Sequence, residues 1–325
     1  MESRRPRAIG YQLLLAFAVI IAAWYFISNA AENLRARQIA SGFSFLLREA
    51  GFEIGETTFL SYHAGDTYLK ALAVGLLNTL RVAAFSALFA TALGTSLGLA
   101  RLSRNWLLAK LAAVYVEFVR NVPLVVQLFF WYAVITENLP APAEALNPLP
   151  GVFLSNRGLA FPAPAAGTPI KLEYPALSGF NFSGGASLSP EFAALLLGLT
   201  VYTAAFVAEI VRAGILAVDR GQLEAARSLG LSERQAMRYV VLPQALRVIV
   251  PPVTSQYLNC TKNSSLAVAI GYPDLVSIAN TAINQTGQAI EGIAIIMLAY
   301  LTISLAISLL MNWYNRRYAV RGSRL

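Results

Sequence analysis

The clearest pattern of polar residues is a segment, residues 219–240, that lies between two strongly apolar stretches. Good helix formers run to Leu229, and Gly230 can then adopt the left-handed conformation that ends a helix. Ser232 can cap a second helix, with Gln235 three residues later completing a capping box. The segment therefore predicts a helix, a tight turn and a second helix. A short helix fixed by a glycine turn is a rigid lever, and its polar surface suits a separable interface.

A second polar group, Lys262, Asn263, Ser264 and Ser265, lies where an apolar stretch ends and a shorter apolar run begins. Polar side chains within membrane spans are costly and mark functional sites by default. This cluster is therefore our candidate for contact with a solute. The alternative is that the Lys262 ammonium merely extends to an interface and that the two hydroxyl groups cap a helix.

Charged residues also stand close together near the ends of apolar stretches. Glu209 and Arg212 are three residues apart, so they share one helix face and can pair locally. Glu117 and Arg120 precede Pro123, which suits the first turn of a helix because the N–H that it lacks has no partner there. These residues predict a local ion pair and the start of a helix.

Few other side chains could take part in chemistry. Asn78 and Thr79 are expected at the outer start of a span, where they either line the mouth of a path or cap the helix, and capping is the preferred interpretation. The single histidine, His63, is expected in a loop, and the single cysteine, Cys260, as a buried small apolar group. One cysteine excludes an internal disulfide and any multi-cysteine metal site, so no metal site is predicted.

The composition indicates a membrane protein. Of the 325 residues, 57% are hydrophobic and 13% are charged, and the mean hydropathy is +0.57. Soluble domains carry about 25% charged residues because they need a charged exterior. The 25 Lys and Arg residues outnumber the 17 Asp and Glu residues, which gives a formal net charge of +8. On a soluble chain that charge would suggest nucleic acid, an interpretation that the hydropathy argues against.

Six apolar stretches are candidates for membrane spans, each of which needs about 20 residues of helix. They are residues 11–27, 76–99, 123–135 extended back through 111–119, 192–216, 240–258 and 290–313. The first stretch could also be a signal peptide, although an uncleaved anchor is the preferred interpretation. A shorter run, residues 266–279, contains Gly271, Pro273 and Asp274 and predicts a broken or re-entrant element that lines something polar.

The distribution of Lys and Arg sets the expected orientation. With the N-terminus inside, the cytoplasmic segments hold more than twice as many of these residues as the outside segments, so both termini are expected in the cytoplasm. Residues 31–70 predict an extracytoplasmic elaboration with interfacial helices. We divide the chain into an anchor and extracytoplasmic segment (1–74) and a transmembrane domain (75–320). The domain carries a proline-rich, loop-like insertion outside (137–190) and a cytoplasmic segment (219–240).

The cytoplasmic segment resembles the EAA signature of ABC importer permeases, EAA-x3-G-x9-[I/V]-x-LP. Every anchor position is matched at the right spacing, by Glu224, Ala225, Ala226, Gly230, Val240, Leu242 and Pro243. In that family the segment is a coupling helix that sits in a groove of the ATP-hydrolysing subunit. The resemblance implies that Glu224, Ala225, Ala226, Gly230 and the Leu-Pro pair couple this chain to an ATPase.

Further segments resemble the polar amino acid uptake permeases. They are residues 75–80 (GLLNTL), 117–128 (EFVRNVPLVVQL), 208–214 (AEIVRAG) and 262–266 (KNSSL). The long N-terminal addition and the outside insertion resemble those of general L-amino-acid permeases, which work as two unlike permease chains. The resemblance covers about residues 75–135 and 190–315. It implies an all-α polytopic fold, the MetI-like transmembrane domain of a type I ABC importer, with six spans and a coupling helix.

The resemblance also implies partners. These are a second permease chain, two copies of an ABC ATPase that bind ATP and Mg, a periplasmic amino-acid-binding protein and the lipids of a bacterial inner membrane. The second permease is expected to be a related but different chain, and a copy of this chain is the alternative. Nucleic acid and a cofactor bound to this chain are not expected. The sequence has no G-x-x-x-x-G-K-[ST] phosphate loop, so this subunit is expected to be non-catalytic.

A zwitterionic amino acid needs a donor for its carboxylate and an acceptor for its ammonium. The pathway candidates are Lys262, Asn263, Ser264, Ser265, Asn78 and Thr79. Asn263 takes a position that is often acidic in family members that move cationic amino acids, so a neutral or broad substrate range is expected. By the same resemblance, structural or gating roles fall to Glu209, Arg212, Glu117, Arg120 and Pro123.

Two other function classes make different predictions. An ATP-independent secondary transporter or channel predicts paired intramembrane carboxylates or inverted repeats, whereas Glu209 is the only acid well inside an expected span and the halves show no similarity. A membrane-anchored regulator that uses residues 226–240 as a DNA-binding helix-turn-helix predicts salt-sensitive duplex binding. Such a unit packs in a three-helix core, whereas expected spans flank this segment closely on both sides.

Overall fold

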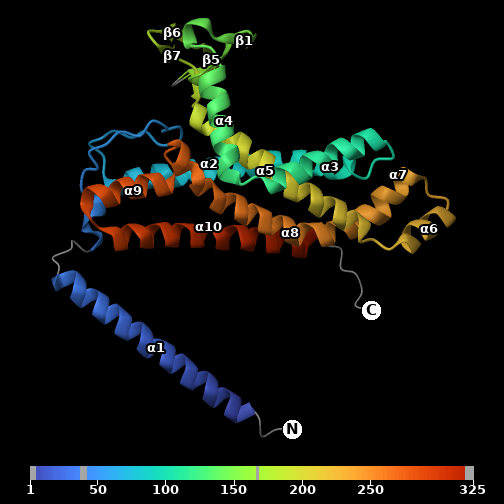
Figure 1. Ribbon diagram of the computed structural model, residues 1–325, viewed down its shortest axis with the longest axis horizontal. Helices are drawn as coiled ribbons and strands as arrows, with labels where there is room; N and C mark the ends of the chain where they lie inside the picture. The colour runs from blue at the N-terminus through green and yellow to red at the C-terminus, as the bar shows by residue number, and fades with distance from the viewer. Residues whose placement is uncertain (1–4, 37–41, 166–167, 319–325) are drawn as a thin grey trace.

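The computed structural model describes residues 5–36, 42–165 and 168–318, and most of this chain is helical (Figure 1). The α-helices are α1 (Arg5–Ala36), α2 (Tyr68–Ala100), α3 (Trp106–Asn121), α4 (Leu124–Asn138), α5 (Pro190–Leu216), α6 (Arg220–Ser228), α7 (Glu233–Ala236), α8 (Leu242–Asn263), α9 (Leu275–Thr286) and α10 (Ala289–Tyr318). Shorter turns are the 3-10 turns η1 (Phe43–Leu47), η2 (Pro142–Glu144) and η4 (Ser264–Ile270) and the π-helical turn η3 (Met237–Val241).

By length and composition, α2, α5 and α10 can each cross a membrane, and two bent helix pairs bring the number to as many as five within the described ranges. One of these pairs is α3 and α4, which meet at 106°. The expected span at residues 111–135 is therefore two helices. Pro123 is the cause, because it holds Val122 before it in an extended conformation (φ −94°, ψ 126°) that ends α3. Pro123 itself lies just ahead of the first turn of α4.

Helix α1 contains the first of the expected spans. Its apolar part, Gly10–Phe26, is exposed at every residue, and the helix lies apart from the others in Figure 1. Leu14 and Trp24 are 67% and 74% exposed, which is how a lipid-facing helix presents its side chains.

The centre of the bundle is the contact between α2 and α5. A Cβ atom on Gly94 would lie 2.7 Å from the Ala204 carbonyl oxygen, and one on Gly98 would lie 2.7 Å from that of Ala208. The two backbones therefore approach more closely than a side chain would allow. Small residues give membrane helices this close packing, since lipid offers no hydrophobic drive between helices.

Residues 42–67 form an outer cap over the ends of α2 and α9. Phe45 and Tyr62 are 1% and 4% exposed and belong to one apolar cluster with Leu275 and Ile278 of α9. Contacts distant in sequence close the cap: the Gly42 N–H donates to Glu291 Oε1 of α10 at 2.5 Å. This cap occupies residues for which the sequence predicted an extracytoplasmic elaboration with interfacial helices, and its helical content within these residues is the single turn η1.

The proline-rich insertion, expected to be loop-like, instead folds into short β-hairpins. The strands are β1 (Leu146–Leu149), β2 (Val152–Ser155), β3 (Gly158–Phe161), β4 (Ala163–Ala165), β5 (Thr168–Glu173), β6 (Ala176–Ser178), β7 (Asn181–Ser183) and β8 (Ala186–Leu188). The antiparallel sheets have the orders β1-β2-β3-β8, β4-β5 and β6-β7. Gly151 and Gly179, with positive φ, make two of the turns, so the residues that suggested a loop separate strands.

Candidate functional site

The polar segment folds as the predicted helix, turn and second helix. Helix α6 ends in a Schellman motif, in which the Leu231 N–H donates to the Ala226 carbonyl (3.2 Å) and the Gly230 N–H to the Arg227 carbonyl (2.9 Å). Gly230 has a φ of +80°, and a Cβ there would meet no atom within 4 Å. Its backbone conformation, and not crowding, is therefore what favours glycine at this position.

Helix α7 begins with the predicted capping box. Ser232 Oγ accepts from the Gln235 N–H at 3.4 Å, and Gln235 Oε1 accepts from the Ser232 N–H at 2.9 Å. Across the turn, Arg227 and Glu233 form an ion pair of 2.6 Å whose side chains are 46% and 62% exposed. The α6–α7 hairpin (residues 219–236) is thus held in shape mainly by its own local contacts.

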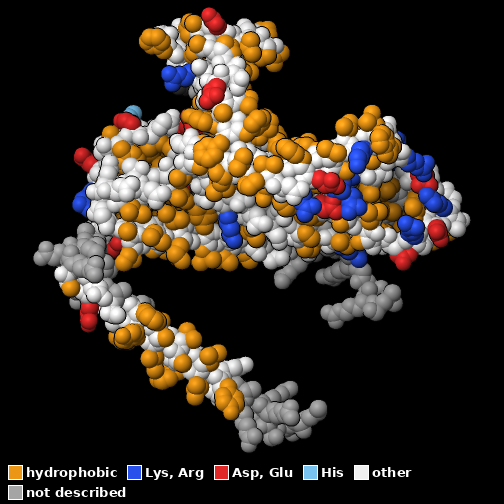
Figure 2. Space-filling model, in the orientation of Figure 1, with side chains coloured by type: hydrophobic (Ala, Val, Ile, Leu, Met, Phe, Trp, Pro, Cys, Tyr) orange, Lys and Arg blue, Asp and Glu red, His pale blue; other side chains and the backbone are white. Residues whose placement is uncertain are grey.

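This hairpin stands at one end of the bundle, where charged side chains gather on the face seen in Figure 2. Ala226 and Ala236 are buried, whereas Glu224 and Ala225 are exposed. Leu229 at the tip is 82% exposed. Sequence reasoning missed Leu229, although an apolar residue in the turn between two helix caps was a visible signal. The hairpin therefore presents an unburied apolar tip surrounded by charge.

Leu242 and Pro243, at the start of α8, shape the joint between the hairpin and that helix. The π-helical turn η3 directly precedes them. Pro243 has no N–H to donate to the carbonyl four residues before it, and a wider turn is one way for the chain to accommodate the missing bond. Gln244 of α8 donates to Gln222 of α6 at 3.5 Å, which ties the helices together beyond the joint.

The cluster Lys262–Ser265 spans the end of α8 and the start of η4. Ser264 Oγ donates to the Thr261 carbonyl and Ser265 Oγ to the Lys262 carbonyl, each at 2.7 Å. Both hydroxyl groups therefore bond back to carbonyls of the preceding helical turn. Lys262 is exposed, and Asn263 is half-buried and lines a cavity.

The cavity beside Asn263 has a volume of about 260 Å³ and lies between α5 and α8. Its other lining residues are Tyr202, Thr203, Phe206, Gln256, Asn259 and Cys260. Gln256, Asn259 and Asn263 follow one another at helical spacing, so their amides lie on one side of α8. Amides supply both donors and acceptors without net charge. Sequence reasoning missed Gln256 and Asn259, although their spacing to Asn263 was readable.

Helix α8 also has a polar face that is exposed. Ser255, Asn259 and Lys262 all lie on this face and are exposed. Helix α8 belongs to a bent pair that passes the criteria for a membrane span. Such side chains are costly against lipid and normally face a bundle interior or water. We therefore expect this polar face to contact a second chain or to line an aqueous path.

Two consecutive prolines, Pro251 and Pro252, lie inside α8 just before this polar face begins. Neither has an N–H, so the carbonyls of Arg247 and Val248 lack the donor that a regular helix would supply. Both prolines are exposed. The backbone of α8 thus adds acceptor groups to the helix next to its polar side chains.

The expected broken element is present between α8 and α9, which form the second bent pair with an angle of 53°. Turn η4 ends at Gly271, whose φ is +78°. Asp274 then caps α9 by accepting from the Ser277 N–H at 2.8 Å. The prediction of a broken helix at Gly271 and Asp274 is confirmed.

Asn78 and Thr79 hold this broken element against α2. Helix α2 is capped by Thr67, so the interpretation of Asn78 and Thr79 as a helix cap is wrong. Asn78 Nδ2 donates to the Pro273 carbonyl at 3.0 Å, and Thr79 Oγ1 accepts from the Leu275 N–H at 3.1 Å. Both side chains are at most 1% exposed. These two bonds join backbone groups 195 and 196 residues away, which local sequence patterns do not reveal.

Glu209 pairs with Arg212 as predicted, with Nη2 and Oε1 2.5 Å apart. It also pairs with Arg101, the residue that ends α2. Sequence reasoning missed Arg101, which comes from another helix. The three side chains therefore join α2 to α5 near the hairpin end. Among the described residues, no three His, Cys, Asp or Glu side chains are grouped so that they could hold a metal ion.

Glu117 and Arg120 lie near the end of α3. Glu117 is exposed, and its carbonyl accepts from Asn121 Nδ2 at 2.8 Å. The Arg120 guanidinium lies 5.1 Å from the ring centroid of Phe206, within cation–π range. Phe206 is also one of the residues that line the cavity between α5 and α8.

The chain is similar to known proteins over most of its length. Residues 90–320 match the family model described as "Binding-protein-dependent transport system inner membrane component". The general L-amino acid transport system permease protein AapQ of Rhizobium johnstonii is 42% identical, and the match covers 98% of this chain and 94% of that protein. The glutamate/glutamine/aspartate/asparagine transport system permease protein BztB of Rhodobacter capsulatus is 38% identical, with 96% and 93% covered.

A solved structure, an amino acid ABC transporter crystallised with histidines, contains a chain of similar fold. The TM-score is 0.57 at 28% sequence identity, and the match covers 77% of this chain and 95% of that one.

Proposed function

Because the chain belongs to the family of ABC importer permeases for polar and general L-amino acids, we propose that it forms part of the translocation path of an ATP-driven amino acid importer and couples to a separate ATPase. Residues 219–240 make the coupling contact, with Glu224, Ala225, Ala226, Gly230, Leu242 and Pro243 as its anchors.

The shape of the α6–α7 hairpin is the observation that carries this proposal. A Schellman motif and a capping box make it stiff, while Glu224, Ala225 and the Leu229 tip are exposed at the end of the bundle. Burying a leucine side chain in a partner's groove is favourable by about 1.5–3 kcal/mol. A stiff hairpin with an apolar tip suits a partner that must both bind it and push it.

A displacement of the hairpin would be transmitted directly to α8. The two are joined through η3 and Pro243, with the Gln244–Gln222 hydrogen bond beside the joint. Helix α8 carries Asn259 and Asn263, so a movement that starts at α6 changes the wall of the cavity. ATP binding would draw the ATPases together and open the cavity outward, and hydrolysis would reset it inward. Both nucleotide and Mg belong to the ATPases.

The path itself follows the polar side of α8. The amides of Asn259 and Asn263 and the exposed Lys262 can bond both ends of a zwitterion, since amides donate and accept and an ammonium group donates. We assign the cover of this face to a second permease, a related but different chain. The absence of an acidic group among the residues lining this cavity suits neutral or mixed amino acids. AapQ and BztB are likewise described as transporting several amino acids.

The remaining partners complete the proposed assembly. Two ATPase copies contact the hairpins below, and a periplasmic amino-acid-binding protein delivers substrate above. The chain lies in a bacterial inner membrane with both termini in the cytoplasm. This orientation follows from the excess of Lys and Arg in the segments on the hairpin side.

Two substitutions test the coupling contact. Glu224→Arg reverses an exposed charge on α6, and Gly230→Pro blocks the left-handed turn, because proline fixes φ near −65°. Both should abolish uptake of radiolabelled amino acids and co-purification of the ATPase with the tagged chain. Matched controls are Glu144→Arg and Gly179→Pro in the insertion, at an exposed acid and at a turn glycine of positive φ. Normal uptake in both hairpin variants would refute the proposal.

The Leu229 tip allows a milder test. Leu229→Asp should reduce ATPase co-purification at least tenfold while leaving the chain's abundance in the membrane unchanged. Phe180→Asp is the control, because Phe180 is 93% exposed at the tip of the β6–β7 hairpin. If both variants retained the ATPase equally well, Leu229 would not be part of the contact.

A further inference from the structure

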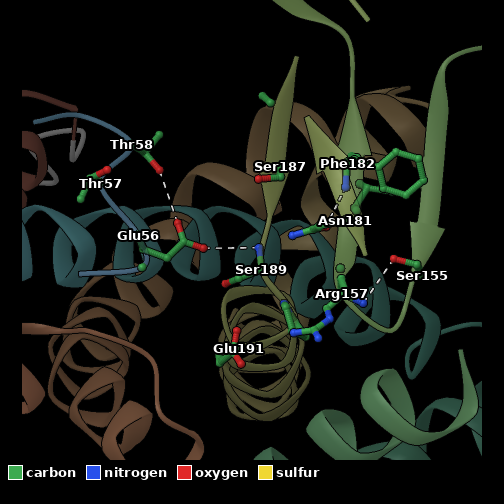
Figure 3. Close-up of a pocket in the computed structure, with 16 residues that line it drawn as sticks. Glu56, Thr57, Thr58, Ser155, Arg157, Asn181, Phe182, Ser187, Ser189 and Glu191 are labelled. Carbon is green, nitrogen blue, oxygen red and sulfur yellow. Dashed lines mark hydrogen bonds between the residues drawn. The ribbon is translucent and has the colours of Figure 1, made fainter. Parts of the chain in front are cut away.

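A second polar cavity lies far from the α6–α7 hairpin, between the outer cap, the insertion and the start of α5 (Figure 3). Its volume is about 520 Å³. Residues 55–58 of the cap form one wall, and strands of the insertion and the turn between β2 and β3 form another. This outer cavity is large enough for a small-molecule ligand, since such sites occupy about 300–1,000 Å³.

One residue that lines the outer cavity, Glu56, belongs to a buried ion pair. Arg81 Nη1 lies 3.0 Å from Glu56 Oε2, and the two side chains are 6% and 10% exposed. The same guanidinium lies 4.0 Å from the ring centroid of Phe192, and Glu56 Oε1 accepts from the Ser189 N–H at 3.3 Å. The charge of Glu56 is therefore neutralised by Arg81, and the pair fixes the cap to α2 and α5.

Two other charged residues of the outer cavity are not neutralised in this way. Arg157, in the β2–β3 turn, is exposed, and within the described chain its guanidinium has neither an ion pair nor a hydrogen bond. Glu191, in the first turn of α5, receives a hydrogen bond from the Tyr132 hydroxyl on Oε1, and Oε2 has no partner among the described residues. Figure 3 shows Arg157 reaching from its turn towards the start of α5, which carries Glu191.

Arg157 and Glu191 line the same cavity, yet they do not form an ion pair with each other. Opposite charges that face one space but remain apart suit a ligand that carries both charges. A carboxylate can pair with the guanidinium and an ammonium group with the glutamate. Asn181 and Ser187 add hydrogen-bonding groups to the wall, and Phe182 adds an apolar surface.

Glu191 also stands where the outer cavity meets another. A neighbouring cavity of about 380 Å³ shares Gly55, Glu56, Ser189 and Glu191 with it. The second cavity reaches Gly271 and Pro273 of the broken element. A ligand at Glu191 would therefore lie between the mouth of the outer cavity and the broken element that packs against α2.

We propose that the outer cavity is a binding site for a zwitterionic amino acid, with Arg157 holding the carboxylate and Glu191 the ammonium group, before the ligand enters the path along α8. The choice of an amino acid among zwitterions rests on the proposed function. The separated charges are observed in the structure independently of it.

Site-specific labelling tests the proposal in the assembled complex in membrane vesicles that present their outer face. Ser187→Cys places a thiol in the cavity wall, where Ser187 is exposed, and the single native cysteine, Cys260, is 1% exposed. A membrane-impermeant maleimide should label the variant and leave the wild type unlabelled. L-glutamine should slow this labelling in a saturable manner. N-acetyl-L-glutamine, which lacks the ammonium group, and L-glutaminamide, which lacks the carboxylate, should not.

Substitutions assign the two charges. Arg157→Ala and Glu191→Gln should each raise the L-glutamine concentration for half-protection at least tenfold, whereas Arg157→Lys should retain much of the protection. Matched controls are Lys171→Ala and Glu173→Gln, which alter exposed charges of β5 that do not line the cavity. Asn263→Ala should leave protection unchanged while impairing uptake, which separates this site from the path along α8. If Ser187→Cys does not fold, Asn181→Cys supplies the thiol.

Two results would overturn the proposal. One is equal protection by L-glutamine and its two one-charge analogues, and the other is no protection by L-glutamine while the amino-acid-free binding protein protects the thiol. The second result would identify the cavity as a protein contact. Either result leaves the proposed importer function standing, because that function is judged by uptake and by ATPase co-purification. If the ATPase did not co-purify while L-glutamine still protected the thiol, the proposed importer function would be refuted and the binding site would stand.

Discussion

The α6–α7 hairpin and the outer cap are stabilised in opposite ways. Within the α6–α7 hairpin, the stabilising contacts are close in sequence and exposed, as in the Arg227–Glu233 pair. Between the outer cap and the helices, the contacts join residues more distant in sequence: Glu56 forms a buried pair with Arg81, and the Gly42 N–H donates to Glu291 across 249 residues. The comparison indicates that the hairpin can move as one rigid unit. The outer cap is instead fixed to the helices of the bundle.

The strongest way to break this comparison is to remove one partner of the buried outer pair. Arg81→Met leaves the Glu56 charge buried and unpaired, which should cost about 3–5 kcal/mol. We expect a lower thermal unfolding temperature and tryptic cleavage within the cap. Lys70→Met is the control, because the Lys70–Asp66 pair at the same end has side chains that are 33% and 27% exposed. Similar losses in both variants would show that burial does not distinguish these pairs.

Thr79→Val tests a neutral contact at the same end. It removes the acceptor for the Leu275 N–H with little change of shape, and leaving a buried donor unsatisfied costs about 1–3 kcal/mol. Thermal unfolding followed by tryptophan fluorescence should show this loss. Thr302→Val should have almost no effect, since Thr302 is exposed and bonds to its own helix. Equal stability of the two variants would contradict the role of Thr79 in holding the broken element.

A pair of glycines sharpens the comparison because they differ in position and little in conformation. Gly230 and Gly287 have φ values of +80° and +73°, and a Cβ at either would meet no atom within 4 Å. Alanine at each should therefore cost about 1–2 kcal/mol locally. Uptake should fall for Gly230→Ala and remain near normal for Gly287→Ala. Equal uptake would mean that stiffness of the hairpin is not needed for coupling.

The smallest effect is expected for the exposed pair of the hairpin. Arg227→Ala should change the free energy of unfolding by less than about 1 kcal/mol, since exposed ion pairs contribute little. The Schellman motif and capping box remain, so uptake should be retained. A loss as large as that of Arg81→Met would show that the ion pair, and not the backbone motif, keeps the hairpin rigid.

The same contrast explains what the sequence could predict. The helix, turn and capping box were predictable because Gly230, Ser232 and Gln235 interact within a few residues. The Glu209–Arg212 pair was predictable for the same reason. Arg101, the second partner of Glu209, was not, because its helix ends 108 residues earlier.

The outer end was predicted less well for physical reasons. The insertion was expected to be a loop because strands of three to six residues show too little alternation to be recognised between prolines and glycines. Asn78 and Thr79 were placed at a helix end because the apolar window began near them, whereas α2 starts at Tyr68. Their partners lie on the broken element, whose approach to α2 depends on tertiary packing.

The paired prolines give α8 polar groups that substitution of its polar side chains does not remove. The carbonyls of Arg247 and Val248, which the ring nitrogens of Pro251 and Pro252 cannot serve, belong to the main chain. Replacing polar side chains one at a time along α8 would show the contributions of Asn259 and Lys262. It would not show the contribution of these carbonyl oxygens. Pro251→Ala and Pro252→Ala would each supply an N–H that can donate a hydrogen bond to one of these carbonyl oxygens. Substituting these two prolines would therefore change the main-chain polarity of α8, which substituting its polar side chains would leave unchanged.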